Sequence, residues 1–276
     1  MMIFYTNSSI LLFPEILTSI PTVISMLKAL LFDVDGTLAD TEKDGHRVAF
    51  NSAFKEAGLD WEWDEELYGK LLAVTGGKER MNYYLDNFNT TFERPDNLQE
   101  MIAELHKTKT GYYTKLLGEG AIPLRPGVKR LIQDARDAGL RLAIATTTTP
   151  ENVTALLENT LGKESIDWFE VIAAGDIVPA KKPAPDIYDW ALKEMDLDAA
   201  DCLAFEDSEN GILSSQGANL KTIITVNDYT LDHDFSEAAI VLNNLGEPDQ
   251  AFKVIAGDDN GKSCVDLEFL EQIQAA

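Results

Sequence analysis

A short apolar run that ends in two aspartates constrains this chain more than any other feature of its sequence. Residues 29–32 read Ala-Leu-Leu-Phe, a run too short for a typical helix and followed by turn residues, and it predicts a buried strand. Side chains two residues apart in a strand point the same way, so Asp33 and Asp35 should leave the strand end on one side. Two adjacent carboxylates repel each other unless a cation lies between them. Oxygen ligands select a hard divalent cation, and the pair therefore predicts an Mg²⁺ site.

A calcium loop and a plain turn are the alternative interpretations of this pattern. A calcium loop that began at Asp33 would need glycine at its sixth position and glutamate at its twelfth. Here the glycine falls at the fourth position, and the twelfth residue is Asp44. The calcium loop is therefore excluded, and a plain turn stays as the alternative.

The remainder of the chain divides into a helical segment and an alternating segment. Between residues 41 and 121 only helical periods occur, such as His46, Phe50 and Phe54 on one face. After residue 121, short apolar runs alternate with helical stretches, which indicates βαβ units and a parallel sheet. The further strands are expected at 140–145, 169–173, 202–205, 222–226 and 239–242. The sequence thus predicts an α/β fold, a Rossmann-like parallel sheet with an inserted all-helical cap.

These patterns divide the chain into several parts. The expected parts are a core domain over 27–40 and 122–245, a helical cap domain over 41–121 and a loop-rich, acidic tail over 246–276. Residues 1–26 form an apolar extension of unclear role that contains no Lys or Arg. A signal peptide would need a basic start, and a transmembrane helix would need ~20 uninterrupted apolar residues. We therefore expect Met26 to be the natural start, with a targeting segment as the alternative.

The charge of the chain excludes some classes of partner. It carries 47 acidic and 23 basic residues, a formal charge of -24, whereas nucleic acids and anionic membranes bind basic surfaces. A small anionic substrate is still allowed, because charges beyond about 8 Å are largely screened at physiological salt. Cys202 and Cys264 form no disulfide framework and no zinc motif, which favours a reducing compartment. We expect a monomer in the cytoplasm, or in the plastid stroma of a photosynthetic eukaryote, with neither nucleic acid nor membrane as a partner.

Polar residues recur where the predicted strands end. In chain order they are Asp33 and Asp35, Thr146, Lys182 in the loop after the third strand, and Glu206 with Asp207. Open α/β sheets bind ligands at the carboxyl ends of their strands, so these side chains should meet. Each signal is weak alone, but together they favour phosphoryl transfer. In that chemistry one carboxylate attacks phosphorus and another moves protons, while a lysine, a hydroxyl and Mg²⁺ offset the charge of the phosphoryl oxygens.

These residues in this order resemble the haloacid dehalogenase superfamily, and the helical insert resembles the cap type shared with β-phosphoglucomutase. The chain is most similar to the CbbY-type sugar phosphatases of that group, over about residues 28–245. The matching segments are Asp33-Val-Asp35-Gly-Thr37, Thr41-Glu42 with His46-Arg47, Thr75-Gly76-Gly77-Lys78-Glu79-Arg80, Ala145-Thr146-Thr147-Thr148, Lys182-Pro183-Ala184-Pro185-Asp186-Ile187-Tyr188 and Glu206-Asp207-Ser208.

The resemblance implies roles for the acidic residues. Asp33 would be the nucleophile and Asp35 the general acid and base. The presence of Asp35 is informative, because the dehalogenases of the superfamily lack a carboxylate there. The implied metal site consists of Asp33, the main-chain carbonyl of Asp35 and Asp207, with Glu206 close by.

The resemblance also implies a substrate. CbbY-type enzymes convert xylulose-1,5-bisphosphate into xylulose-5-phosphate, which enters the Calvin cycle. Thr146 and Lys182 would hold the transferring phosphoryl group, and Thr147 and Thr148 would bind the substrate beside them.

The cap is expected to recognise the sugar and its distal phosphate. In the loop before its third helical stretch, Gly76 and Gly77 would let the backbone approach a phosphate, and Lys78 would supply charge. A solvated loop between two helices is the alternative. Arg80 joins this group unless it points along the next helix.

Glu42 and His46 lie near the predicted cap hinge and would touch substrate hydroxyls. His46 also lies on an apolar helix face, so a core histidine is its alternative. Two other functions stay open: a sugar-phosphate mutase of the β-phosphoglucomutase type, and a non-catalytic sugar-phosphate-binding protein.

Overall fold

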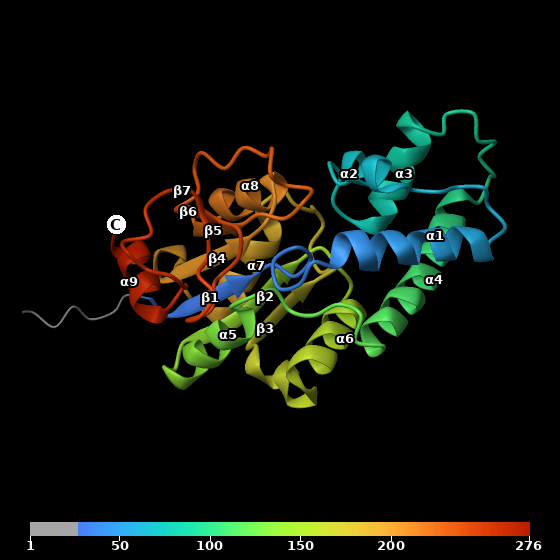
Figure 1. The fold of residues 1–276 in the computed structure, drawn as a ribbon. Helices are drawn as coiled ribbons and strands as arrows, with labels where there is room; N and C mark the ends of the chain where they lie inside the picture. Colours follow the sequence, from blue (N-terminus) through green and yellow to red (C-terminus); the bar gives the residue numbers. More distant parts are fainter. Residues whose placement is uncertain (1–26) are drawn as a thin grey trace, which may run out of the picture.

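A computed structural model describes residues 27–276, and the predicted extension 1–26 lies outside the described residues. Seven strands form one sheet in the order β3-β2-β1-β4-β5-β6-β7 (Figure 1). Neighbouring strands from β3 to β6 run parallel, and β7 is antiparallel to β6. The strands are β1 (Ala29–Phe32), β2 (Arg141–Thr146), β3 (Val171–Ala174), β4 (Cys202–Glu206), β5 (Lys221–Thr225), β6 (Ile240–Leu242) and β7 (Val254–Ala256). This arrangement confirms the predicted α/β fold with its parallel sheet.

Strand β1 lies between β2 and β4, and its side chains alternate between two hydrophobic layers. Leu30 and Phe32 belong to the cluster on one face of the sheet, and Ala29 and Leu31 belong to the cluster on the other. Phe32 stacks on Phe205 of β4 with ring centroids 4.6 Å apart. Such a pair contributes about 0.5–1.5 kcal/mol beyond its burial. Because a shift of one residue would exchange the two layers, this packing fixes the strand register.

Helices cover both faces of the sheet (Figure 1). The face with the larger side chains packs against α5 (Val128–Asp137), α6 (Pro150–Leu161) and α9 (Leu267–Ala275). The other face packs against α7 (Asp186–Met195), with α8 (Glu209–Gly217) beside it. Two short 3-10 helices, η2 (Lys163–Trp168) and η3 (Ala199–Asp201), lie in the connections. Among residues 27–276, no helix has both the length and the apolar character that a membrane span requires.

Four helices between β1 and β2 form a separate group to one side of the sheet, which we call the cap (Figure 1). A π-helical turn, η1 (Glu42–His46), leads into α1 (Arg47–Glu56), α2 (Glu65–Leu71), α3 (Gly77–Asn87) and α4 (Leu98–Gly118). The cap has a hydrophobic core of its own, which includes Phe50, Phe54, Trp61 and Trp63. Its shape therefore depends mainly on its own packing.

The strands end within two residues of the predicted positions, but the C-terminal region differs from the prediction. A loop-rich tail was expected over 246–276, whereas the structure has β7 and α9 there. Helix α9 buries Phe269, Leu270 and Ile273 against the sheet, and the side chain of Asp266 caps it by accepting a hydrogen bond from the Phe269 amide at 2.8 Å. Helix α9 was not predicted because its nine residues give only a short helical period, which the surrounding acidic residues obscure.

Candidate active site

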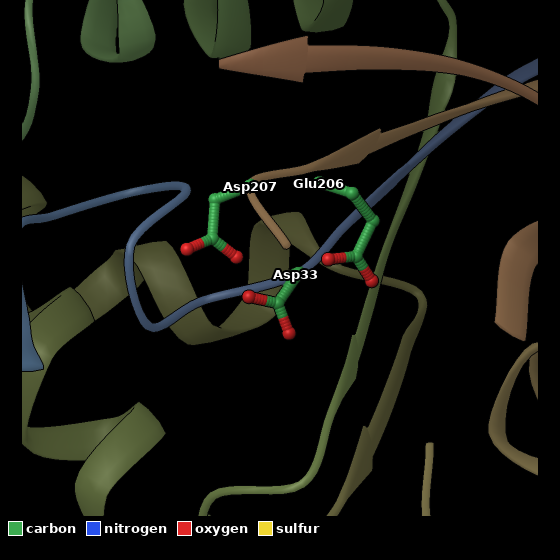
Figure 2. Close-up of side chains that lie close together, drawn as sticks. All are labelled: Asp33, Glu206 and Asp207. Carbon is green, nitrogen blue, oxygen red and sulfur yellow. The ribbon is translucent and has the colours of Figure 1, made fainter. Parts of the chain in front are cut away.

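Three carboxylates meet at the carboxyl end of the sheet. Strand β1 lies where the strand order reverses, which is where open α/β sheets bind their ligands. Asp33 directly follows β1, Glu206 is the last residue of β4, and Asp207 comes next. One oxygen of each lies within 4.8 Å of the others, and all three residues are buried (Figure 2). We call these three residues the carboxylate cluster.

Lys182 is the cation of this cluster. Its Nζ donates to Oδ1 of Asp33 at 2.7 Å, to Oε1 of Glu206 at 2.6 Å and to the carbonyl of Ala145 at 2.9 Å. Burial alone would lower the pKa of this ammonium, but the Asp33 and Glu206 carboxylates raise it above its ordinary value. Tyr188 donates a further hydrogen bond to Oε1 of Glu206 at 2.6 Å. The lysine therefore stays charged.

The donor set of the carboxylate cluster fits Mg²⁺. Three carboxylates and one ammonium leave a formal charge of -2 when all are ionised, which a divalent cation would offset. Burial raises the pKa of Asp33 to about 7 and raises that of Asp207 well above its ordinary value, so these groups resist ionisation without a cation. Oε2 of Glu206 is buried and has no hydrogen-bond partner among residues 27–276. Buried oxygen ligands with this charge suit a hard divalent ion.

Asp35 lies outside the carboxylate cluster and faces the cap hinge. Its Oδ1 accepts hydrogen bonds from Oγ1 of Thr41 at 2.6 Å and from Nε2 of His46 at 2.8 Å. Burial alone would raise the pKa of Asp35, but His46 and Thr41 hold it below the ordinary range. Asp33 and Asp35 line one cavity, but Asp35 does not join the three converging carboxylates, because β1 ends at Phe32 and the strand geometry no longer applies at Asp35. A metal contact through the main-chain carbonyl of Asp35 stays a prediction.

Lys109 continues this chain of hydrogen bonds and was not singled out from the sequence. Its Nζ lies 2.7 Å from Nδ1 of His46. An ammonium only donates, so Nδ1 accepts and Nε2 carries the proton that faces Asp35. Burial lowers the pKa of Lys109 to about 8, which leaves it mostly charged at neutral pH. The sequence signal was a lysine on the buried face of α4, in helical register with Leu105 and Tyr113.

The loop after β5 and one arginine position the cluster, and neither was predicted. Nδ2 of Asn227 donates to Oδ2 of Asp207 at 2.7 Å. The buried guanidinium of Arg125 donates to the carbonyls of Gly36 and of Thr225, the latter at 2.9 Å. Gly36 has a φ of 86°, and a Cβ there would lie 2.1 Å from Oδ2 of Asp207, so this turn requires glycine. The partners of Asn227 and Arg125 are distant in sequence or are main-chain carbonyls, so no local sequence pattern reveals these two residues.

A cavity of about 290 Å³ opens above the carboxylate cluster. The predicted site residues that line it are Asp33, Asp35, Glu42, Arg80, Thr146, Thr147, Lys182, Glu206 and Asp207. On the cap side, Nη1 of Arg80 donates a hydrogen bond to Oη of Tyr68 at 2.7 Å and lies 3.5 Å from Oε2 of Glu42. Tyr68 in turn donates to Glu42. The cavity thus has a cationic group on its cap side and the carboxylate cluster on its core side.

The structure does not bring Gly76 and Lys78 into this cavity. Nζ of Lys78 pairs with Oδ2 of Asp176 at 2.5 Å, and Nζ of Lys181 binds the other oxygen of the same carboxylate. These residues line a second cavity of about 480 Å³ at the seam between the cap and the core. The predicted glycine-lysine loop therefore joins the cap to the core in this arrangement.

Gly77 and Thr148 also lie outside the first cavity. A Cβ on Gly77 would lie 2.6 Å from the ring of His106, so this glycine makes room for a cap side chain. Oγ1 of Thr148 accepts a hydrogen bond from Nδ2 of Asn152 at 2.9 Å, which engages it in the first turn of α6.

The family model of haloacid dehalogenase-like hydrolases matches residues 27–219. The chain therefore belongs to the haloacid dehalogenase-like hydrolases.

Its relatives narrow the class further. Protein CbbY of Rhodobacter capsulatus is 52% identical over 212 residues, which cover 77% of this chain and 91% of the relative. The protein named CbbY, plasmid, of Cupriavidus necator is 47% identical over 222 residues, 80% of this chain and 87% of the relative. A crystal structure of mutant CbbY from Rhodobacter sphaeroides in complex with xylulose-(1,5)bisphosphate matches with a TM-score of 0.74 at 45% identity, over 79% of this chain and 94% of that one. These similarities confirm the predicted CbbY-type phosphatase.

Proposed function

We propose that this protein is a Mg²⁺-dependent phosphatase that hydrolyses xylulose-1,5-bisphosphate to xylulose-5-phosphate. The observation that carries this proposal is a single cavity lined both by the carboxylate cluster with Lys182 and by Arg80 of the cap. One end of a bisphosphate would react at the cluster while the guanidinium binds the other phosphate. The related CbbY that was crystallised with xylulose-(1,5)bisphosphate supports this choice of substrate.

Asp33 is suited to attack phosphorus. Lys182 holds its Oδ1, and among residues 27–276 the hydrogen-bond partner of Oδ2 is Oγ1 of Thr37 at a long 3.4 Å. In the first step, Oδ2 bonds to phosphorus and the bond from phosphorus to the sugar oxygen breaks. Lys182 and Thr146 would hold the phosphoryl oxygens, and Mg²⁺ bound by the carboxylate cluster would offset their charge.

Asp35 would move the protons of both steps. It gives a proton to the departing sugar oxygen, then takes one from the water that attacks phosphorus and breaks the bond to Asp33. His46 and Thr41 keep Asp35 ionised in the free enzyme, which suits the second step. A phosphate dianion beside Asp35 raises its proton affinity when substrate binds, so Asp35 takes up from solvent the proton that it gives in the first step. After the second step Asp35 returns to solvent the proton that it took from water.

A phosphate-release screen tests the proposal. We expect the protein with Mg²⁺ to release phosphate from xylulose-1,5-bisphosphate faster than from other ketopentose bisphosphates and from hexose monophosphates. Isomerised sugar without free phosphate would instead identify a mutase, and no turnover on the whole panel would identify a binding protein. The monomeric state and the cytoplasmic or stromal location stay predictions.

Arg80 should matter more than Lys78 for a bisphosphate. The Arg80→Met variant is expected to raise KM for xylulose-1,5-bisphosphate by about 10- to 100-fold, because a hydrogen bond to a charged group contributes about 1.5–3 kcal/mol. KM for p-nitrophenyl phosphate, which has no second phosphate, should change far less. Steady-state kinetics on both substrates measure the difference.

Lys78→Met is the matched control, since it also removes one positive charge from α3 but outside the first cavity. We expect it to change KM for the bisphosphate by less than about threefold, as for a surface ion pair. A larger effect on KM at Lys78 than at Arg80 would show that the glycine-lysine loop, and not Arg80, binds the distal phosphate. Thermal melting of both variants checks that Tyr68 and Glu42 tolerate the loss of Arg80.

A further inference from the structure

A loop of the core contacts the cap through Tyr229, a residue that has no role in the proposed chemistry. It follows β5 and contains Asn227, Tyr229 and Thr230. Oδ1 of Asn227 accepts a hydrogen bond from the Tyr229 amide at 3.0 Å, and the Asn227 amide donates to Oγ1 of the buried Thr230 at 3.0 Å. Nδ2 of the same Asn227 holds Asp207 at 2.7 Å. One side chain thus fixes both a carboxylate of the cluster and the backbone of Tyr229.

The ring of Tyr229 packs directly on the cap. A Cβ on Gly69 of α2 would lie 3.2 Å from Cδ1 and 3.4 Å from Cε1 of Tyr229, so the ring lies close against the α2 backbone. The ring also meets Tyr68 edge-on, with centroids 6.1 Å apart and planes at 64°. Tyr229 lines both the active-site cavity and an adjoining cavity of about 480 Å³, so it forms part of the wall between them.

Tyr68 connects this contact to substrate recognition. Its hydroxyl donates to Glu42 and accepts from Nη1 of Arg80 at 2.7 Å. Glu42 of η1, which leads into the cap, and Arg80 of α3 both line the active-site cavity. A shift of the Tyr68 ring would therefore move both polar groups relative to the carboxylate cluster.

We propose that Tyr229 is a positioning residue for sugar recognition: its ring is a docking point of the cap on the core, and it holds Tyr68, and through Tyr68 the groups of Glu42 and Arg80, above the carboxylate cluster. The ring carries this role, because the Tyr229 hydroxyl is buried without a hydrogen-bond partner in the part of the chain that the structure describes. Removal of an unpartnered buried hydroxyl costs little, whereas removal of the ring opens the contact. The inference rests on the proposed function for the recognition of a sugar phosphate by Glu42 and Arg80 and for the identity of that sugar phosphate.

Two substitutions at Tyr229 and two substrates test the proposal. Tyr229→Ala is expected to lower kcat/KM for a sugar phosphate about tenfold more than for p-nitrophenyl phosphate, mainly through KM, because the aryl ester carries no groups for Glu42 and Arg80 to recognise. Tyr229→Phe keeps the ring and should stay within about twofold of the wild type on both substrates.

A variant on the cap side tests the same contact independently. Gly69→Ala places a methyl group against the Tyr229 ring and should shift the substrate preference in the same direction. Combining it with Tyr229→Ala should add little further loss, because both changes break one contact. Gly111→Ala is the matched control, since this glycine of the cap helix α4 has open space around its Cβ position.

Three results would overturn the inference. Equal losses of Tyr229→Ala on both substrates would show an effect on the carboxylate cluster through Asn227 instead of on sugar recognition. Unchanged kinetics would remove the docking role, and a loss in Tyr229→Phe as large as in Tyr229→Ala would transfer it to the hydroxyl. If Tyr229→Ala does not fold, as judged by thermal melting, Gly69→Ala decides. Failure of the wild type on xylulose-1,5-bisphosphate would reject only the proposed substrate, because the same ratio can be measured with any sugar phosphate that the protein hydrolyses.

Discussion

The Asp33→Asn variant is expected to lose at least about four orders of magnitude in kcat, since removal of a nucleophile that acts within a catalytic unit has effects of this size. Asparagine has nearly the shape of aspartate, and its amide oxygen can still accept the hydrogen bond that Nζ of Lys182 gives to Oδ1 at 2.7 Å. The amide cannot form the aspartyl-phosphate that the proposed first step requires. The loss should therefore be similar for sugar phosphates and for p-nitrophenyl phosphate, unlike the loss at Arg80.

Thermal melting and a matched variant separate a chemical effect from a folding effect at Asp33. We expect Asp33→Asn to melt at or above the temperature of the wild type in metal-free buffer, because burial penalises the Asp33 carboxylate. Asp137→Asn makes the same change at an exposed position at the end of α5 and should keep full activity. Turnover above about 1% in Asp33→Asn, with deamidation excluded by mass spectrometry, would remove Asp33 as the nucleophile.

The core half of the site was predictable because strand ends obey a simple rule. Each polar residue after a parallel strand lies at the same edge of the sheet, so Asp33, Thr146 and Asp207 had to approach one another. The structure adds neighbours such as Asn227 and Arg125. Their contacts join residues that are 20 and 100 positions apart in the sequence, so no periodic pattern in the sequence reveals them. The rule also stops where the strand stops, which is why the side chain of Asp35 turns to the hinge.

The cap half was less predictable because helical geometry divides neighbouring residues between faces. Lys78 and Arg80 are two residues apart in α3, and such residues do not share a helix face. The sequence suggested both for the distal phosphate, but the structure places Arg80 in the active-site cavity and Lys78 at the seam with Asp176. Which face meets the core depends on how the cap docks, and docking depends on long-range contacts such as that of Tyr229.

Removal of divalent cations should abolish phosphate release, and Mg²⁺ should restore it. Without a cation, the carboxylate cluster would face a phosphate dianion with Lys182 as its only positive partner among the described residues of the cluster. Repulsion between the buried carboxylates and the phosphate dianion would strongly oppose substrate binding. Dialysis against EDTA, followed by assays with and without added Mg²⁺, measures the effect. Full activity in the chelated protein would contradict the assignment of the cluster to a metal.

The same cluster should make the stability of the metal-free protein depend on pH. Burial raises the pKa of Asp33 to about 7 and that of Asp207 well above its ordinary value, so the folded protein keeps protons that the unfolded chain releases near a pH of about 4. Because the folded state binds more protons, stability falls as the pH rises from about 4 through 7. Mg²⁺ takes the place of these protons, so saturating Mg²⁺ should raise Tm more at pH 8 than at pH 5, by about 5 °C. Asp207→Asn should lose most of this difference in thermal melts, and an equal rise at both pH values in the wild type would show that the cation binds elsewhere.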